Sequence, residues 1–258
     1  MSNQSAQLRE LLSTSHHIAI LTGAGISAES GLRTFRGVTS THPTPPPDMA
    51  ALWRDFDPAT LATPEAFERD PELVTRWYDW RRLGCLAAEP NAGHLALAEL
   101  ERGVNTRGGT LTLLTQNVDR LHHRAGSVNI VELHGSIIQW RCTRTGNKLT
   151  PPNAPMALFP PPSPFASGAL LRPEVVWFGE ALPEGAVAAA QHAAATCDLF
   201  LSIGTSSVVY PAASFIQSAA RRGAKTVEIN LEPTPISDMV DLSIRGKAGD
   251  VLPRALKG

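Results

Sequence analysis

The 258-residue sequence has few cysteines, almost no net charge and no long apolar run. Its three cysteines, at positions 85, 142 and 197, are too few and too scattered for a disulfide framework, which favours a reducing compartment. The net charge of -1 provides no general attraction to nucleic acid or an anionic membrane, so we expect neither as a partner. No apolar run approaches the ~20 residues that span a bilayer, and the polar amino-terminal segment does not resemble a signal peptide. We therefore expect a cytoplasmic protein.

Apolar runs and helical patterns alternate along the chain. Six short runs are nearly continuously apolar, as in strands that are covered on both faces. They are residues 17–22, 111–116, 129–133, 198–203, 225–230 and 239–244. Helical patterns separate several of them, at 92–104, 182–197 and 210–223. This alternation predicts an α/β fold with a Rossmann-like, doubly wound parallel sheet.

Two segments, 34–86 and 137–170, interrupt this alternation. The first opens on a proline-rich loop and continues into helices that Thr63 and Asp70, each before a proline, are suited to cap. In the second, prolines are too dense for a helix or a central strand. We expect both to form a smaller inserted domain over the ligand-binding edge of the sheet. The main, Rossmann-like domain would then comprise residues 1–33, 87–136 and 171–258.

The first expected strand runs directly into Gly23-Ala24-Gly25-Ile26-Ser27-Ala28. Glycines here permit a tight turn and let backbone N–H groups approach a pyrophosphate at a helix N-terminus. A plain structural turn is the alternative, because this pattern alone is a weak signal. A dehydrogenase would add an acidic residue about 20 residues further on, but that region is a proline loop in which Asp48 is poorly placed. The pattern is therefore consistent with a dinucleotide site and disfavours a dehydrogenase.

Further motifs follow the glycine turn. In order, they are GAGISAESG (23–31), TFRG (34–37), TQNVD (115–119), LHGS (133–136), VVWFGE (175–180) and GTSSVVYPA (204–212). Together these motifs resemble those of the sirtuins, NAD-dependent protein-lysine deacylases, and the resemblance spans about residues 16 to 253. It implies NAD as cofactor and acyl-lysine proteins or peptides as substrates. The implied reaction transfers the acyl group to ADP-ribose and releases nicotinamide and free lysine.

His134 ends an expected strand and precedes a glycine, which would leave room for a ligand. An imidazole that titrates near neutral pH is suited to act as a general base on a ribose hydroxyl. A lone histidine is more often a hydrogen-bonded core residue, but the neighbouring motifs favour the catalytic interpretation. By the same resemblance, we predict His134 and Asn117 as the catalytic residues.

Asn117 and Asp119 follow the end of an expected strand, where short polar side chains can contact ribose or nicotinamide. Both residue types also suit N-capping of the next helix, and Asp119 could serve both purposes. The resemblance implies further ligands for the cofactor. The complete predicted set is Gly23, Ala24, Gly25, Ala28, Phe35, Arg36, Gln116, Asn117, Asp119, Gly204, Thr205, Ser206, Asn230, Glu232 and Ala248.

The helical stretch 71–86 carries Tyr78 and Arg81 three residues apart, hence on one face and about 60° apart. A tyrosine hydroxyl and a guanidinium can together bind a carboxylate. This pair, followed by EPNAGH (89–94), resembles the sirtuin branch that removes succinyl and malonyl groups. The alternative is that Tyr78 packs in the interior while Arg81 lies on a solvated face with Asp79 and Arg82. The resemblance also implies that Val176 and Phe178 form walls of the acyl-lysine tunnel.

Two other functions would use the same nucleotide pocket. One is ADP-ribosyl transfer or hydrolysis of NAD, and the other is an NAD-sensing module without turnover. His134 and the pair of Tyr78 and Arg81 favour deacylation, because the loss of nicotinamide alone requires neither feature. The sequence leaves the oligomeric state and the natural protein targets open. It also provides no account of Arg33, which stands where most sirtuins have proline.

The stretch WRCTRTG (140–146) begins like a zinc knuckle but has no second cysteine. Cys142 matches the first of the four ligands that sirtuins usually have, while Thr145 occupies the place of the second. One thiolate does not hold a structural zinc, so we expect no zinc and no other metal. His122 and His123 would lie near the nucleotide rather than near this stretch. Prolines and a local apolar cluster of Met156, Leu158, Phe159 and Phe165 are the expected substitutes.

Overall fold

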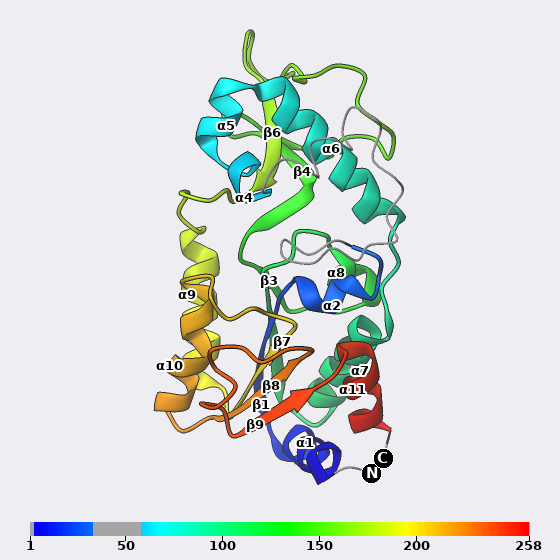
Figure 1. Cartoon of the computed structure of the whole chain (residues 1–258), viewed down its shortest axis with the longest axis vertical. Helices are drawn as coiled ribbons and strands as arrows, with labels where there is room; N and C mark the ends of the chain where they lie inside the picture. Colours follow the sequence, from blue (N-terminus) through cyan, green and yellow to red (C-terminus); the bar gives the residue numbers. More distant parts are fainter. Residues whose placement is uncertain (1–2, 33–57, 258) are drawn as a thin grey trace.

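A computed structural model describes residues 3–32 and 58–257. Its main sheet is entirely parallel, in the order β3-β2-β1-β7-β8-β9. The strands are β1 (His17–Thr22), β2 (Thr110–Thr115), β3 (Ile130–Glu132), β7 (Leu199–Ile203), β8 (Lys225–Asn230) and β9 (Leu242–Arg245). All six overlap the apolar runs, which confirms the expected Rossmann-like α/β sheet (Figure 1). Strands β2 and β3 are added on one side of β1, and strands β7, β8 and β9 on the other, so that β1 and β7 flank the usual ligand crevice of such sheets.

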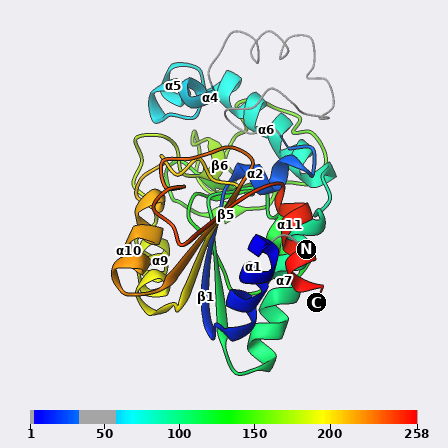
Figure 2. The same cartoon turned by 60° about the horizontal axis from the view of Figure 1, so that its bottom comes forward.

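Helices cover both faces of this sheet (Figure 2). One face is covered by α1 (Asn3–Thr14), α7 (Ala92–Thr106) and α11 (Ala248–Leu256), and the other by α9 (Glu184–Thr196) and α10 (Phe215–Arg221), which a short helical turn, η1 (Ala212–Ser214), precedes. Leucine and isoleucine side chains of the strands alternate between the two resulting cores. This double burial explains why the strands are continuously apolar. No described helix is long and apolar enough to cross a membrane.

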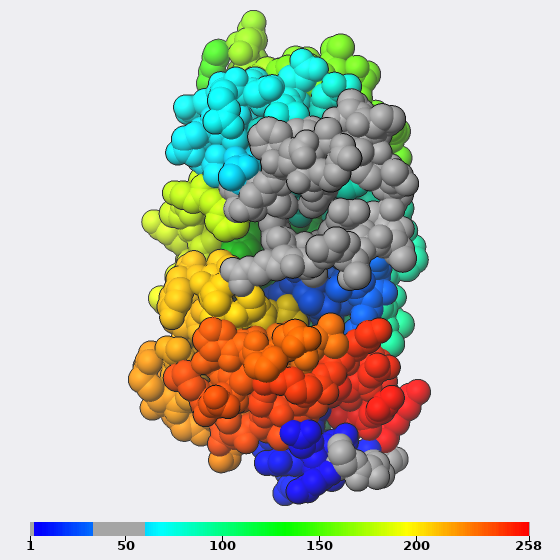
Figure 3. Space-filling view, in the orientation of Figure 1, coloured from blue at the N-terminus to red at the C-terminus, as the bar shows by residue number. Residues whose placement is uncertain are grey.

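A smaller module lies at one end of the molecule (Figures 1 and 3). It contains an antiparallel sheet in the order β5-β4-β6, with its own hydrophobic core. Its elements are α4 (Pro58–Leu61), α5 (Pro64–Arg69), α6 (Pro71–Ala87), β4 (Gly135–Cys142), β5 (Lys148–Leu149) and β6 (Leu171–Val175). The caps are as expected: Thr63 accepts a hydrogen bond from the Ala66 N–H, and Asp70 from the Leu73 N–H.

The antiparallel sheet itself differs from expectation. Residues 135–142 form a strand, and β6 pairs with it from beyond the expected boundary at residue 170. The prediction that residues 137–170 contain no helix and no central strand is confirmed only for the proline-rich part after β5. The first strand was missed because its pattern is not continuously apolar. Its pairing with β6 joins residues far apart in the chain, from Cys142 with Leu171 to Gly135 with Val175. The division of the chain into two domains stays a prediction.

Candidate active site at the carboxyl ends of the strands

Two loops meet in close backbone contact where β1 and β7 end. β1 runs into α2 (Ala24–Ala28), and the loop after β7 begins with Gly204 at φ +61°. A Cβ atom on Gly25 would lie 2.7 Å from the Gly204 Cα, and one on Gly204 would lie 2.5 Å from the Ile26 nitrogen. Neither position therefore accepts a side chain without moving the backbone.

The N–H groups of this turn have partners within the protein. Gly23 donates to the Ile203 carbonyl at 3.0 Å, and Gly25 donates to the Gly204 carbonyl at 2.8 Å. These two glycines thus join the β1 and β7 loops, rather than leaving their N–H groups for a pyrophosphate as the sequence suggested. Contact of Gly23, Ala24, Gly25 or Ala28 with a cofactor stays a prediction.

Asn117 and Asp119 meet on the hydroxyl of Ser27. The Asn117 amide donates to the Ser27 Oγ at 3.1 Å and to the Gly23 carbonyl at 3.0 Å. Ser27 in turn donates to the Asp119 Oδ2 at 2.8 Å. All three side chains are buried. The structure therefore brings the two predicted residues together through Ser27, a residue of the glycine motif to which the sequence assigned no role.

Asp119 also stabilises the start of α8 (Leu121–Ala125). Its Oδ1 accepts the Leu121 N–H at 2.9 Å, so the expected capping function is present, although Arg120 holds the N-cap position. Burial raises the pKa of Asp119, while the hydrogen bonds from Leu121 and Ser27 lower it in part. Both carboxylate oxygens of Asp119 thus accept hydrogen bonds, and the carboxylate is linked to Asn117 through the Ser27 hydroxyl.

Two buried histidines lie behind this cluster. The Asn91 N–H donates to the His94 Nδ1 at 3.3 Å, which places the ring proton on Nε2, 3.4 Å from the Ser27 Oγ. Burial lowers the pKa of His94 to about 4, so the ring is neutral. The ring of His122 lies 4.7 Å from that of His94, and its Nε2 lies 3.0 Å from the Thr22 Oγ1. Only tertiary packing reveals this arrangement; the capping motif at Asn91 was its one signal in the sequence.

His134, which was expected at the end of a strand, lies in the turn between β3 and β4, two residues after β3 ends. Its Nδ1 lies 2.9 Å from the Gln116 carbonyl oxygen, which can only accept, so Nδ1 carries the proton and Nε2 has a free lone pair. Burial lowers the pKa of His134, and the hydrogen bond to Gln116 offsets part of this effect. The side chain is half-buried. A neutral imidazole with an unprotonated Nε2 is a general base.

Gly135 makes room for a strand, and the expectation that it clears space for a ligand is wrong. At φ +75°, its Cβ position lies 2.1 Å from the Glu174 carbonyl oxygen on β6. Beyond the paired strands β4 and β6, Val176, which was predicted to line the tunnel, donates its N–H to the His134 carbonyl at 3.0 Å. Two residues further on, Phe178 is bonded through its N–H to the Ala62 carbonyl. Its ring is 47% exposed, so it is no core aromatic.

On α6, the structure separates four neighbouring side chains into two pairs. The Arg81 guanidinium lies over the rings of Trp77 and Tyr78, 4.6 and 5.5 Å from their centroids. Tyr78 is buried, which raises its pKa to about 12 and keeps its hydroxyl protonated. Asp79 and Arg82 form an ion pair of 2.6 Å in the interior, so the alternative that placed them with Arg81 on a solvated face is wrong.

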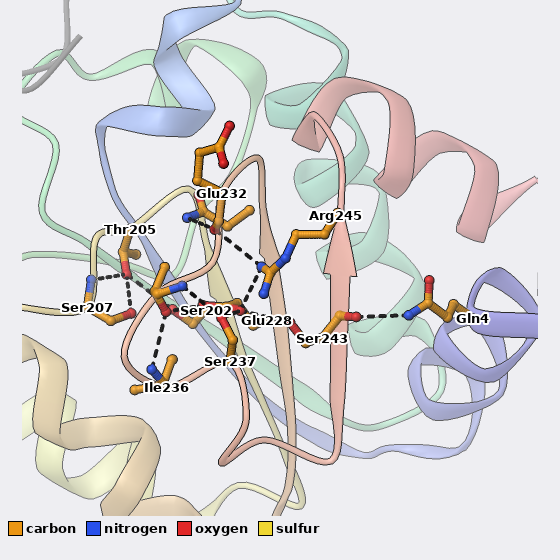
Figure 4. A network of polar contacts seen from close by, with 12 residues as sticks. Gln4, Ser202, Thr205, Ser207, Glu228, Glu232, Ile236, Ser237, Ser243 and Arg245 are labelled. Atoms are coloured by element: carbon orange, nitrogen blue, oxygen red, sulfur yellow. Dashed lines mark hydrogen bonds and ion pairs between the residues drawn. The ribbon is translucent and has the colours of Figure 1, made fainter.

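The predicted adenosine end of the site lies where β7 and β8 finish (Figure 4). The Thr205 hydroxyl interacts with Ser207 at 2.9 Å, and Ser206 stands between them in the chain. Asn230 ends β8, and its amide donates to the Glu232 carbonyl at 3.0 Å, while Figure 4 shows the Glu232 carboxylate pointing away. The Ala248 side chain is buried in the main core, and contact of this residue with a cofactor stays a prediction. Phe35 and Arg36, like Arg33 and Asp48, lie outside the described residues.

The surroundings of Cys142 do not fit a structural zinc. Burial raises the pKa of this thiol, but hydrogen bonds from the Ser163 and Thr145 side chains and from the N–H groups of Thr145 and Arg144 lower it to about 6. One sulfur and two hydroxyls are not the four sulfur or nitrogen ligands that such a site needs. Within residues 3–32 and 58–257, no three His, Cys, Asp or Glu side chains are grouped to hold a metal ion. The expected apolar cluster is wrong, because Leu158 and Phe165 are exposed.

Comparisons with known proteins agree with this geometry. The model of the Sir2 family matches residues 23–211. NAD-dependent protein deacylase 2 of Pyrobaculum aerophilum is 48% identical over 96% of this chain and 93% of its own. The mitochondrial NAD-dependent protein deacylase sirtuin-5 of Danio rerio is 40% identical over 99% and 87%. A crystal structure of a Sir2 homolog–NAD complex superposes with a TM-score of 0.86 at 42% identity, covering 96% of this chain and 91% of that one. The family match and the extent of these similarities show that the chain belongs to the Sir2 family.

Proposed function

We propose that this protein is an NAD-dependent protein-lysine deacylase that removes acidic acyl groups, succinyl and malonyl, in preference to acetyl. The observation that carries the proposal is the orientation of His134, whose Nδ1–H is held by the Gln116 carbonyl. That bond leaves Nε2 as a base, while the His134 backbone carbonyl accepts the N–H of Val176, the residue that follows β6. The relatives described above as NAD-dependent deacylases support the cofactor and the general reaction.

His134 and Asn117 have different proposed roles at the carboxyl edge of the sheet. When bound, NAD supplies a ribose carbon that loses nicotinamide and accepts the acyl oxygen. His134 takes the proton from a ribose hydroxyl at its Nε2 and remains oriented by Gln116. Asn117 donates both of its amide N–H groups, to the Gly23 carbonyl and to Ser27, so its amide oxygen is held in a fixed position for contact with the ligand. This preorganisation lowers the cost of reorientation during the reaction.

The acyl preference rests on α6. The Arg81 guanidinium lies 5.5 Å from the centre of the Tyr78 ring, and Tyr78 stays protonated because burial raises its pKa to about 12. A guanidinium and a phenolic hydroxyl on one helix face are donors suited to a carboxylate. Stacking on Trp77 restricts the Arg81 side chain before a ligand arrives, which reduces the entropy lost on binding.

The deciding experiment uses one peptide carrying acetyl, malonyl, succinyl or glutaryl lysine, with NAD and the full chain. We expect O-acyl-ADP-ribose by mass spectrometry and the highest kcat/KM for a dicarboxylic acyl group. Bare ADP-ribose, or ADP-ribosylated protein, would instead identify a glycohydrolase or ADP-ribosyltransferase. NAD that binds and stays intact would identify a sensor. A clear preference for acetyl would reject the acidic-acyl assignment alone.

We further propose that the ion pair of Asp79 and Arg82 holds the proline-rich segment of the module in place of a zinc ion. Arg82 donates to the Pro152 carbonyl at 2.8 Å and to the Ala154 carbonyl at 2.7 Å. Asp79 accepts the Met156 N–H at 3.0 Å. A single helix turn thus satisfies three backbone groups of a segment that has almost no regular hydrogen bonding of its own. Elemental analysis tests the absence of zinc, and one zinc per chain would contradict it.

A further inference from the structure

Glu228 is a buried carboxylate in the main sheet that the proposed chemistry does not use. It lies on β8, two residues before Asn230, and its side chain is 1% exposed. Its Oε1 accepts from the Thr234 hydroxyl, and its Oε2 accepts from Ser237 at 2.6 Å, Ser243 at 2.9 Å and Arg245 at 3.0 Å. Burial raises the pKa of Glu228, yet these four donors together hold it below its ordinary value. The group is therefore an ionised anchor.

Half of these donors belong to the loop that leaves β8. Thr234 and Ser237 lie within residues 231–241, which connect β8 to β9. They also bond to each other, because the Thr234 N–H donates to the Ser237 Oγ at 2.8 Å. Between them, Ile236 is buried in the core on the α9 and α10 side of the sheet. The middle of the loop is thus fixed to the sheet through one carboxylate and one apolar side chain.

The same anchor reaches the first residues of the loop. Arg245, held by Glu228, also donates from its Nη1 to the Glu232 carbonyl at 3.3 Å. That carbonyl accepts the Asn230 amide from the other side. The Glu232 backbone is therefore fixed by two donors, while its exposed carboxylate points away from the network and is free to meet a ligand (Figure 4). In the space-filling view, this orange-to-red part of the chain forms the lower part of the molecule (Figure 3).

We infer that Glu228 is a positioning residue for the cofactor: through Thr234, Ser237 and Arg245, it sets the Asn230–Glu232 segment that contacts the adenosine ribose. The inference rests on the proposed function and on the predicted contact of Asn230 and Glu232 with NAD, which the family resemblance places at the adenosine ribose. Because the segment is remote from His134 and the acyl-lysine tunnel, the anchor acts on the affinity for NAD and leaves the chemical step unchanged.

The test compares two serines that donate to the same Glu228 oxygen. Ser237→Ala removes a donor in the loop, and Ser243→Ala removes one on β9. We expect Ser237→Ala to weaken ADP-ribose binding, measured by calorimetry, about fivefold and to raise KM for NAD similarly, with kcat and KM for the peptide unchanged. Ser243→Ala keeps the loop bonds and the wild-type affinity. Equal affinities for all three proteins, or equal losses in both variants, would overturn the inference.

Glu228→Gln provides the larger perturbation, because its amide nitrogen would face donors such as Arg245. We expect about tenfold weaker binding of ADP-ribose. Asp241→Asn is its control: Asp241 accepts from the Thr226 N–H and hydroxyl at the opposite end of β8, far along the strand from Asn230. It should lower stability without changing affinity. Since calorimetry needs no turnover, a wild-type protein that binds ADP-ribose but does not deacylate would reject the proposed function while these ratios still judge the inference.

Discussion

The main sheet and the small module are stabilised by different kinds of interaction. In the main sheet, aliphatic side chains on β1, β2, β7 and β8 fill two cores, and Glu228 on β8 is a buried ionisable exception. In the module, the rings of Trp77, Tyr78 and Trp177 pack among buried charges, including the Arg172 guanidinium, which lies 3.2 Å from the centre of the Trp177 ring. Apolar burial stabilises a fold without a preferred direction, whereas ring contacts and ion pairs stabilise it only when the interacting groups are suitably oriented.

This difference matches the proposed division of roles. In the proposal, the residues that do the chemistry lie at the sheet edge, where backbone contacts such as that of Gly25 with Gly204 join the loops. The residues proposed to select the acyl group lie in the module, which depends on directional contacts for its shape. We therefore expect changes at the sheet edge to affect rate, and changes in the module to affect stability and selectivity.

The largest effect is expected for His134→Ala. Removal of the general base should lower kcat by about 10²- to 10⁴-fold, while the affinity for NAD stays within about twofold. Steady-state kinetics and calorimetry measure the two quantities. His192→Ala, at an exposed position on α9, is the control and should leave both unchanged. A His134→Ala protein with near wild-type kcat would show that His134 is not the general base.

Next in size is Arg82→Met, which leaves the Asp79 carboxylate buried without its partner. We expect a loss of about 3–5 kcal/mol in the free energy of unfolding, measured by denaturant titration. Arg76→Met, at an exposed position on the same helix, should cost less than about 1 kcal/mol. The double variant Asp79→Leu/Arg82→Met should be more stable than Arg82→Met. Equal stability of Arg82→Met and Arg76→Met would refute the proposed role of the pair in the module.

Arg81→Met tests selectivity within the module. Loss of the guanidinium should raise KM for a succinyl-lysine peptide about 30-fold or more, while KM for the acetyl-lysine peptide changes less than about twofold. The methionine keeps much of the side-chain volume beside Trp77, so packing on α6 is disturbed little. Arg76→Met again serves as the matched control. An equal loss with both peptides would show that Arg81 supports the fold rather than the acyl carboxylate.

The smallest effect concerns pH. Because burial lowers the pKa of His134 despite the Gln116 hydrogen bond, the imidazole is already neutral at pH 7. Activity that needs the neutral base should fall only as the pH drops through this lowered pKa. We expect kcat/KM to change by less than about twofold between pH 7 and 8. A profile whose acid limb is centred above pH 6.5 would contradict this assignment.

The sequence alone predicted the parallel sheet, because strands buried on both faces are continuously apolar. This pattern can be recognised without knowing which strands pair. It also predicted the starts of α5 and α6, because Thr63 and Asp70 act on N–H groups three residues away. The antiparallel sheet of β4 and β6 could not be predicted in this way. Its pairing joins distant residues, and the bulky charged groups on it are stabilised only after folding.

At the site, the sequence determined which residue types stand at the strand ends, and the family motifs named most of them. Only the tertiary structure shows the contacts that these residues make. The Gln116 carbonyl fixes the ring proton of His134, Ser27 joins Asn117 to Asp119, and the lack of a side chain at Gly135 lets β6 approach closely. The tertiary structure also decided that Arg82 is buried and Arg81 is not, although both lie on one helix. The reason is physical: a hydrogen-bond partner or a burial depth depends on what packs from elsewhere in the chain.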